Sequence, residues 1–149
     1  MEREIDLERI ERAWQRVAGR TEADAPETLI RNTCRLRDAY GQMAERCGNP
    51  SVRRCLYRLR ASADRQLLTL QREAFLLSGD SFLVRREREP LPEGFLERLR
   101  LCWQWEEETS KSLLTPEMTD RQKRMREKLR EESECRRCLL ERILAQALG

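Results

Sequence analysis

Hydrophobic residues recur every three or four positions along most of this 149-residue chain, the pattern of helices that bury one face. Four long segments show it, over residues 26–47, 51–79, 93–113 and 119–148, so we expect an all-α protein. The expected inward positions are Leu29, Thr33, Leu36, Tyr40, Met43 and Cys47; Val52, Leu56, Leu59, Ala63, Gln66, Leu70, Ala74 and Leu77; Leu96, Leu99, Cys102, Trp103, Glu106, Ser110 and Leu113; and Met125, Leu129, Ser133, Arg136, Leu140, Ile143, Leu144 and Ala147.

A shorter amphipathic segment precedes these four and is expected to form a helix that ends at Gly19. We therefore divide the chain into an N-terminal helix with its linker, residues 1–24, and a helical domain, residues 25–149. The apolar face of the short segment consists of Ile5, Leu7, Ile10, Trp14 and Val17.

The spacing of the four long segments predicts two helical hairpins. Short turns are expected at residues 48–50 and 115–119. The segment 51–79 is expected to form a helix that begins after a Ser51 N-cap and is about 42 Å long. Residues 80–92 carry a charge run and two prolines, and fully extended they could span about 43 Å. One long crossover between two hairpins is the ferritin-like arrangement of a four-helix bundle.

The first expected hairpin also carries short stretches with a family pattern. They are Asp38–Ala44, which includes Tyr40, then Asn49-Pro50, and Ala74–Gly79 at the end of the segment 51–79. Together they resemble the first hairpin of bacterial ferritin-like proteins related to rubrerythrin. Residues 99–113 and 129–144 are similar to the second hairpin, and the resemblance extends over residues 27–147.

The resemblance implies six positions for metal ligands. Ferritin-like oxidases hold two iron or manganese ions with a Glu on each of two helices and a Glu-x-x-His motif on each of the other two. Only Glu106 among the matching positions is still a ligand type, and Arg136 would repel cations. We therefore expect the fold without the di-metal site, with no cofactor and no catalytic activity. The six vacated positions are Thr33, Ala63, Gln66, Glu106, Ser133 and Arg136.

Two opposite charges at the vacated site are expected to pair. Glu106 and Arg136 would both project inward, and an isolated buried ion costs far more than a paired one. Thr33, Gln66 and Ser133 would then supply hydrogen bonds, with Arg37 as a second cation near the rim of the site.

The composition excludes several kinds of chemistry. The chain has no histidine, so it cannot form a Ser-His-Asp triad or a Cys/His zinc finger. Its 30 basic and 27 acidic residues leave a net charge of only +3, which does not require a nucleic-acid partner. Arginines are frequent over residues 121–130, but glutamates interrupt and follow them, so a solvated salt-bridged face is expected there. An Arg-rich protein that binds nucleic acid is the weakest alternative.

Cysteines offer another alternative function. Cys135 and Cys138 form a Cys-x-x-Cys pair on the outward side of the last helix, and together with Glu106 they could serve a metal-binding or redox protein. A single such pair is weak evidence, so incidental surface thiols are preferred. The charged N-terminus has no signal-peptide core, and no apolar run approaches about 20 residues. We expect a cytoplasmic protein with reduced thiols and no membrane association.

The expected positions of two tryptophans indicate where another helix or subunit could bind. Trp103 is expected in the core, whereas Trp105 and Leu101 would form an outward apolar patch that something must cover. The N-terminal helix could cover this patch on its own bundle or on a second subunit. The expected function is a structural or protein-interaction module that works as a homodimer or with another protein.

Overall fold

The computed structural model describes residues 26–79 and 90–149, and these residues form an all-helical bundle. No strand occurs in either range. The expected N-terminal helix and most of the expected crossover lie outside the described residues. The helices are α2 (Pro26–Arg46), α3 (Pro50–Ser78), α4 (Phe95–Ser112) and α5 (Asp120–Leu148).

Local capping interactions set the helix ends. The Asn49 side chain accepts hydrogen bonds from the backbone of Ser51 and Val52, so the N-cap of α3 is Asn49 and not Ser51. α3 ends at Gly79, whose φ of 74° is favourable only for a residue without a β-carbon. α5 begins with a reciprocal capping box between Thr119 and Gln122.

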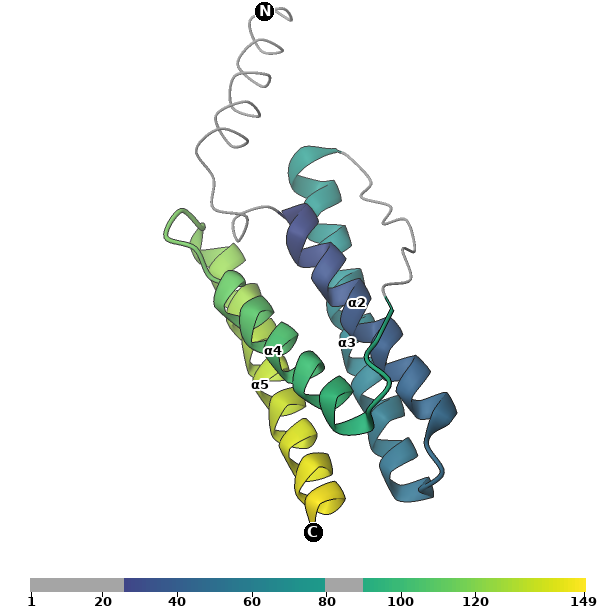
Figure 1. Cartoon of the computed structure of the whole chain (residues 1–149). Helices are drawn as coiled ribbons and strands as arrows, with labels where there is room; N and C mark the ends of the chain where they lie inside the picture. Colours follow the sequence, from purple (N-terminus) through teal and green to yellow (C-terminus); the bar gives the residue numbers. More distant parts are fainter. Residues whose placement is uncertain (1–25, 80–89) are drawn as a thin grey trace, which may run out of the picture.

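The helices form two antiparallel hairpins that pack side by side (Figure 1). α2 packs against α3 and α4 against α5, while α2 also contacts α4 and α3 contacts α5. α3 ends at the end of the bundle where α2 begins, and α4 begins at the opposite end, so α3 and α4 run parallel. The last residue of α3 and the first residue of α4 therefore lie at opposite ends of the bundle.

Two apolar clusters make up the core. The larger one lies around the α2–α3 turn, the start of α4 and the second half of α5, and it includes Leu36, Tyr40, Leu59, Leu99 and Leu140. The smaller one lies towards the other end of the bundle. Its members are Leu29, Ile30, Cys34, Leu67, Leu70, Ala74, Leu113 and Leu129.

Most expected inward positions are buried, with corrections near the helix ends. On α5 the inward residue of the first turns is Arg126 and not its neighbour Met125, which is only partly buried. Leu77 is 61% exposed and Leu96 is 42% exposed, and Ala147 is also exposed. All three residues lie within the first or last turn of their helices.

The two tryptophans have similar environments, contrary to expectation. Trp103 packs against the larger apolar cluster but is only partly buried, and its indole nitrogen donates to Glu141. Trp105 packs against the core, with the Arg35 guanidinium 6.0 Å from its ring centroid, and Leu101 is likewise partly buried. Trp105 turns towards α2 because α2 and α4 are neighbours, so no exposed Trp105–Leu101 patch exists for a further helix to cover.

No described helix combines the length and the apolar composition that crossing a membrane would require.

The assignment of the inward faces of α3 and α5 can be tested by placing a charge in the core. Leu59 and Leu140 are each 1% exposed, so Leu59→Asp and Leu140→Asp should unfold the protein. A buried unpaired charge costs several kcal/mol against a total stability of about 5 to 15 kcal/mol. Leu76→Asp is the matched control, because Leu76 is 82% exposed. Thermal unfolding followed by circular dichroism measures all three, and near-wild-type midpoints for both core variants would contradict the assigned faces.

Candidate functional site

A layer of polar side chains crosses the middle of the bundle between the two apolar clusters. Each helix contributes to it, and every member is at most 2% exposed. Such a layer requires internal partners, because water does not reach it. We call it the central polar layer, and its members are Thr33 on α2, Gln66 on α3, Glu106 on α4, and Ser133 and Arg136 on α5.

Hydrogen bonds connect the layer from α2 to α4. Arg136 Nε donates to Glu106 Oε2 at 2.7 Å, and Arg136 Nη2 donates to Gln66 Oε1 at 2.6 Å. Gln66 Nε2 in turn donates to Thr33 Oγ1 at 3.1 Å. One guanidinium therefore binds both a carboxylate and an amide, and the amide passes the connection on to the remaining helix.

Further hydrogen bonds join members of the layer to a neighbouring side chain and to backbone carbonyls. The Thr33 hydroxyl donates to the Leu29 carbonyl one turn earlier, at 2.7 Å. Arg136 Nη1 donates to the Ser62 hydroxyl at 3.0 Å, and Ser133 Oγ donates to the Glu106 carbonyl at 3.4 Å. Sequence reasoning missed Ser62, which precedes the inward Ala63 by one residue.

The structure thus brings five of the six matched ligand positions together through hydrogen bonds. The sixth, Ala63, is fully buried in the larger apolar cluster. Arg37 does not join the layer, because it pairs with Asp38 and Asp64 at the edge of the α2–α3 hairpin.

Burial and charge act against each other at Glu106. Burial raises the pKa of its carboxyl above the usual range, whereas the Arg136 guanidinium lowers it without offsetting the burial. Burial and the Glu106 charge raise the pKa of Cys102 to about 12, so this thiol stays protonated at neutral pH. The same two causes raise the pKa of Tyr40 well above its ordinary value. These neighbours are poor nucleophiles.

Three buried oxygens at or beside the layer have no hydrogen-bond partner among the residues that the structure describes: Tyr40 Oη, Glu106 Oε1 and Thr109 Oγ1. Tyr40 and Thr109 are both 0% exposed. Sequence reasoning placed Tyr40 correctly on the inward face but gave no indication that its hydroxyl would lack a partner. The free carboxylate oxygen means that Arg136 satisfies only one side of Glu106.

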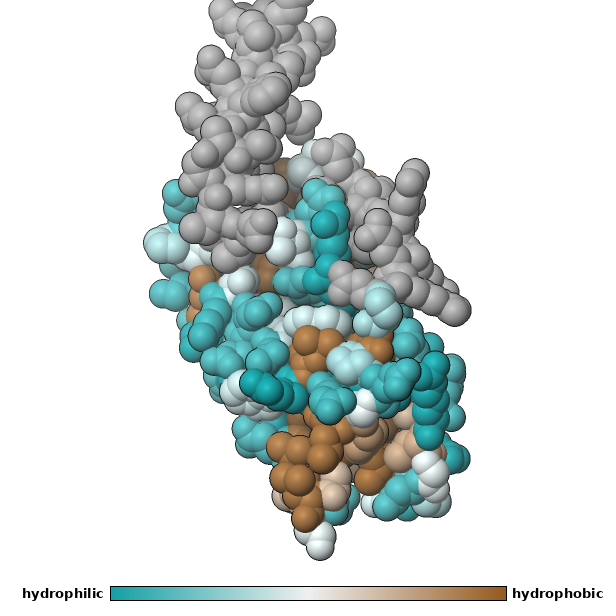
Figure 2. Space-filling view, viewed as in Figure 1, coloured by the Kyte–Doolittle hydropathy of each residue, from teal (hydrophilic) through white to brown (hydrophobic). Residues whose placement is uncertain are grey.

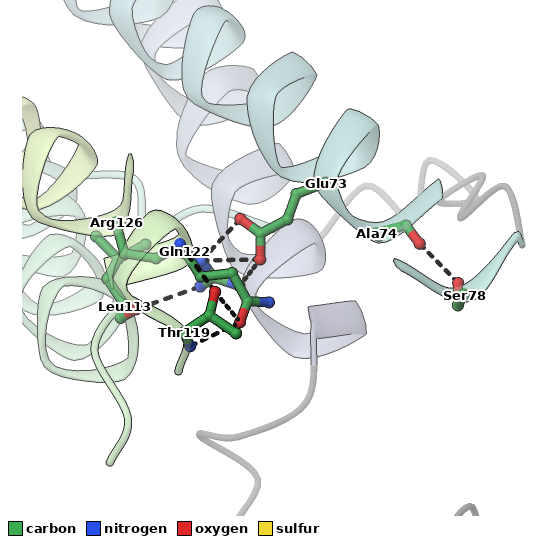
Figure 3. Close-up of polar contacts among 7 residues, drawn as sticks. All are labelled: Glu73, Ala74, Ser78, Leu113, Thr119, Gln122 and Arg126. Carbon is green, nitrogen blue, oxygen red and sulfur yellow. Dashed lines mark hydrogen bonds and ion pairs between the residues drawn. The ribbon is translucent and has the colours of Figure 1, made fainter. Parts of the chain in front are cut away.

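A second buried ion pair lies towards the other end of α5 (Figure 3). Arg126 Nη2 and Nε donate to Glu73 Oε1 and Oε2 at 2.7 and 3.0 Å, a bidentate contact between α5 and α3. Arg126 Nη1 also donates to the Leu113 carbonyl at 3.4 Å. Sequence reasoning missed this pair. The available signal was spacing, since Arg126 precedes the inward Leu129 and Ser133 by three and seven residues.

The cysteine pair lies apart from the central polar layer. Cys135 and Cys138 are exposed, whereas Glu106 is 0% exposed in the core, so the two thiols and the carboxyl group do not share a site. Within residues 26–79 and 90–149, no three His, Cys, Asp or Glu side chains gather in a way that could hold a metal ion. No known protein-family model, curated protein or solved structure matches the chain.

The central polar layer is suited to holding helices together. Its cation is a guanidinium, which does not lose its proton in proteins, and its carboxylate is bound on one side by that cation. Neither group is placed to exchange protons with a substrate, since both are buried. The arrangement fixes the positions of four helices by charge and hydrogen bonds.

The contribution of the central ion pair can be measured with a double-mutant cycle. Glu106→Leu or Arg136→Met alone should lower the free energy of unfolding by about 3 to 5 kcal/mol, because each leaves a buried group without its partner. Glu106→Leu combined with Arg136→Met should cost much less than the sum of the single losses. Denaturant unfolding of the variants measures the coupling, and additive effects would show that the pair contributes nothing of its own.

The raised pKa of Glu106 predicts a pH dependence. In Arg136→Met the main group that lowers the pKa of the Glu106 carboxyl is gone and only Arg137 still opposes burial, so the folded-state pKa rises further above the unfolded value. The variant should be most stable at acid pH and lose stability as pH rises through this raised pKa. Unfolding free energies between about pH 5 and pH 8 measure the slope.

The control for this slope is Glu106→Gln combined with Arg136→Met, which has no carboxyl to titrate at this position. The stability difference between the two variants should narrow as the pH falls. A difference that stays constant with pH would mean that Glu106 is not held above its ordinary pKa.

Proposed function

We propose that the chain is a ferritin-like helical bundle that has lost its di-metal site and serves as a non-catalytic structural or protein-interaction module. The observation that carries the proposal is the position of Arg136. Its guanidinium contacts Ser62, Gln66 and Glu106 in the middle of the core, where the family's ligands would surround two cations. In this proposal the positive charge of Arg136 attracts polar groups on the neighbouring helices, as the metal ions would in the family.

The arrangement of the six matched positions supports this proposal. All six are at most 2% exposed, and they come from all four described helices. Positions chosen by unrelated spacing would not be expected to meet at one level of the core. The parallel course of α3 and α4 adds support, since a long connection between two antiparallel hairpins is the ferritin-like topology.

The proposal extends to partners. We assign the interaction to protein surfaces, either between two copies of this chain or with another protein, in the cytoplasm. An apolar surface between α4 and α5 supports protein partners, because exposed apolar grooves mark such contacts. The small net charge of +3 gives little support to a nucleic-acid partner.

Metal content and a variant with restored ligands test the proposal together. The wild-type protein, purified without chelators, should carry far less than one iron, manganese or zinc ion per chain by elemental analysis. The restored variant replaces five positions according to the family pattern and should take up two divalent ions. Its changes are Thr33→Glu, Ala63→Glu, Gln66→His, Ser133→Glu and Arg136→His.

A matched control keeps Arg136 and carries only the other four changes, so the positive charge remains where the ions would bind. It should take up less metal than the full set. Stoichiometric iron or manganese in the wild type would overturn the non-catalytic assignment. Zinc that disappears in Cys135→Ser with Cys138→Ser would favour the thiol alternative instead. A folded five-position variant that binds no metal would overturn the ferritin-like alignment.

A further inference from the structure

An apolar groove lies between α4 and α5, away from the central polar layer. It has a volume of about 500 Å³ and lies near the end of the bundle where α4 begins and α5 ends. In Figure 2 apolar surface gathers at this end of the molecule. The floor and walls are Leu96, Leu99, Trp103, Leu140 and Leu144, with Glu97, Arg100 and Glu141 around them.

The groove has the form that receives an amphipathic helix. Leu96, Leu99 and Trp103 repeat at helical spacing along one wall, and Leu140 and Leu144 repeat along the other. The Trp103 indole is held in place by its hydrogen bond to Glu141, at 3.2 Å. Two ridges of apolar side chains with a fixed tryptophan fit the i, i+3, i+7 side chains of a helix laid between them.

We propose that the occupant of this groove is the N-terminal segment of the chain, residues 5–17. Leu7, Ile10, Trp14 and Val17 repeat at three- and four-residue spacing, so in a helix they would lie along one narrow face. An isolated helix of this length is marginal in water, so it gains its stability by docking.

The residues that flank this face also suit the groove. In heptad terms the flanking positions are Asp6, Glu11, Ala13 and Ala18, two acidic and two small. The small pair permits close approach to the groove walls. The charge at the groove is mixed, with Arg100 beside Glu97 and Glu141, so contacts of the acidic pair add little to the docking.

The chain outside the described helices is long enough to reach the groove. α2 begins at the same end of the bundle as α5, and Leu140 and Leu144 lie about 30 to 36 Å along α5 from that end. The nine residues from Val17 to Pro26 extend to about 31 Å, and Trp14 can lie a few ångströms further. Since α2 does not contact α5, the groove also lies to one side of the start of α2. Docking on the same chain therefore needs the linker at its full extension, whereas docking on a second copy does not.

Another exposed apolar run, Phe75, Leu76 and Leu77, fits the segment less well. These residues are 54%, 82% and 61% exposed. Successive residues on a helix are about 100° apart, so the three side chains spread around the end of α3 and form no stripe or groove.

Photo-crosslinking of the full-length protein tests the docking. Trp14 is replaced by benzoylphenylalanine, a photoreactive aromatic residue, and its crosslinks are located by mass spectrometry. They should map to the groove, at Leu96, Trp103 or Leu144. The mass of the product shows whether the groove belongs to the same chain or to a second copy. Crosslinks at Phe75–Leu77, or none at the groove, would overturn the proposal.

Groove variants of the crosslinking protein test specificity. Leu96→Glu and Leu144→Glu should each lower the yield about tenfold, the change that corresponds to about 1.4 kcal/mol of lost contact. Leu76→Glu is the matched control and should leave the yield unchanged, since it adds the same charge outside the groove. Circular dichroism identifies folded variants, and an unchanged yield in a folded Leu96→Glu protein would also overturn the proposal. The crosslinking yield does not depend on metal content, so it tests the docking separately from the proposed function.

Discussion

The contact between Glu106 and Arg136 constrains the rest of the bundle. Both groups are essentially unexposed, and a buried ion without a partner costs more than a typical helix contact provides. The two side chains come from α4 and α5, and the guanidinium also binds Gln66 on α3. The axial position and rotation of three helices therefore have to agree before either charge is compensated.

The apolar clusters supply stability, while the polar layers select one arrangement of the helices. Leucine and alanine faces can slide or rotate against each other at small cost, because hydrophobic contacts have no direction. The strength of an ion pair or of a bidentate arginine–carboxylate contact does depend on the direction of its hydrogen bonds. The central layer separates the two apolar clusters, and the Glu73–Arg126 pair adds a second fixed level on α5. Alternative registers would bury at least one of these charges alone.

Periodicity predicted the helices and the inward face at most positions, including those of Glu106 and Arg136, because a 3.6-residue repeat places residues on a helix face directly. Periodicity did not predict which residue is buried where burial depends on a side chain of another helix. Met125 and Arg126 are neighbours on the helix surface, and only Glu73, 53 residues earlier in the sequence, makes the arginine the buried one. Trp105 was misplaced for the same reason, since its cover comes from α2. Whether the Tyr40 hydroxyl would find a partner could not be read from spacing.

The two arginines of α5 have a consequence for the order in which the chain assembles. Glu73, Gln66 and Glu106 all precede α5 in the sequence, and their cationic partners are Arg126 and Arg136. A ribosome therefore releases the acidic and amide members of both layers before the guanidinium groups that compensate them. The α2–α3 hairpin can form early from contacts close in sequence, whereas α4 would bury Glu106 unpaired if it docked alone. Closure of the core thus waits for α5, and a chain halted before Arg136 keeps its second hairpin open.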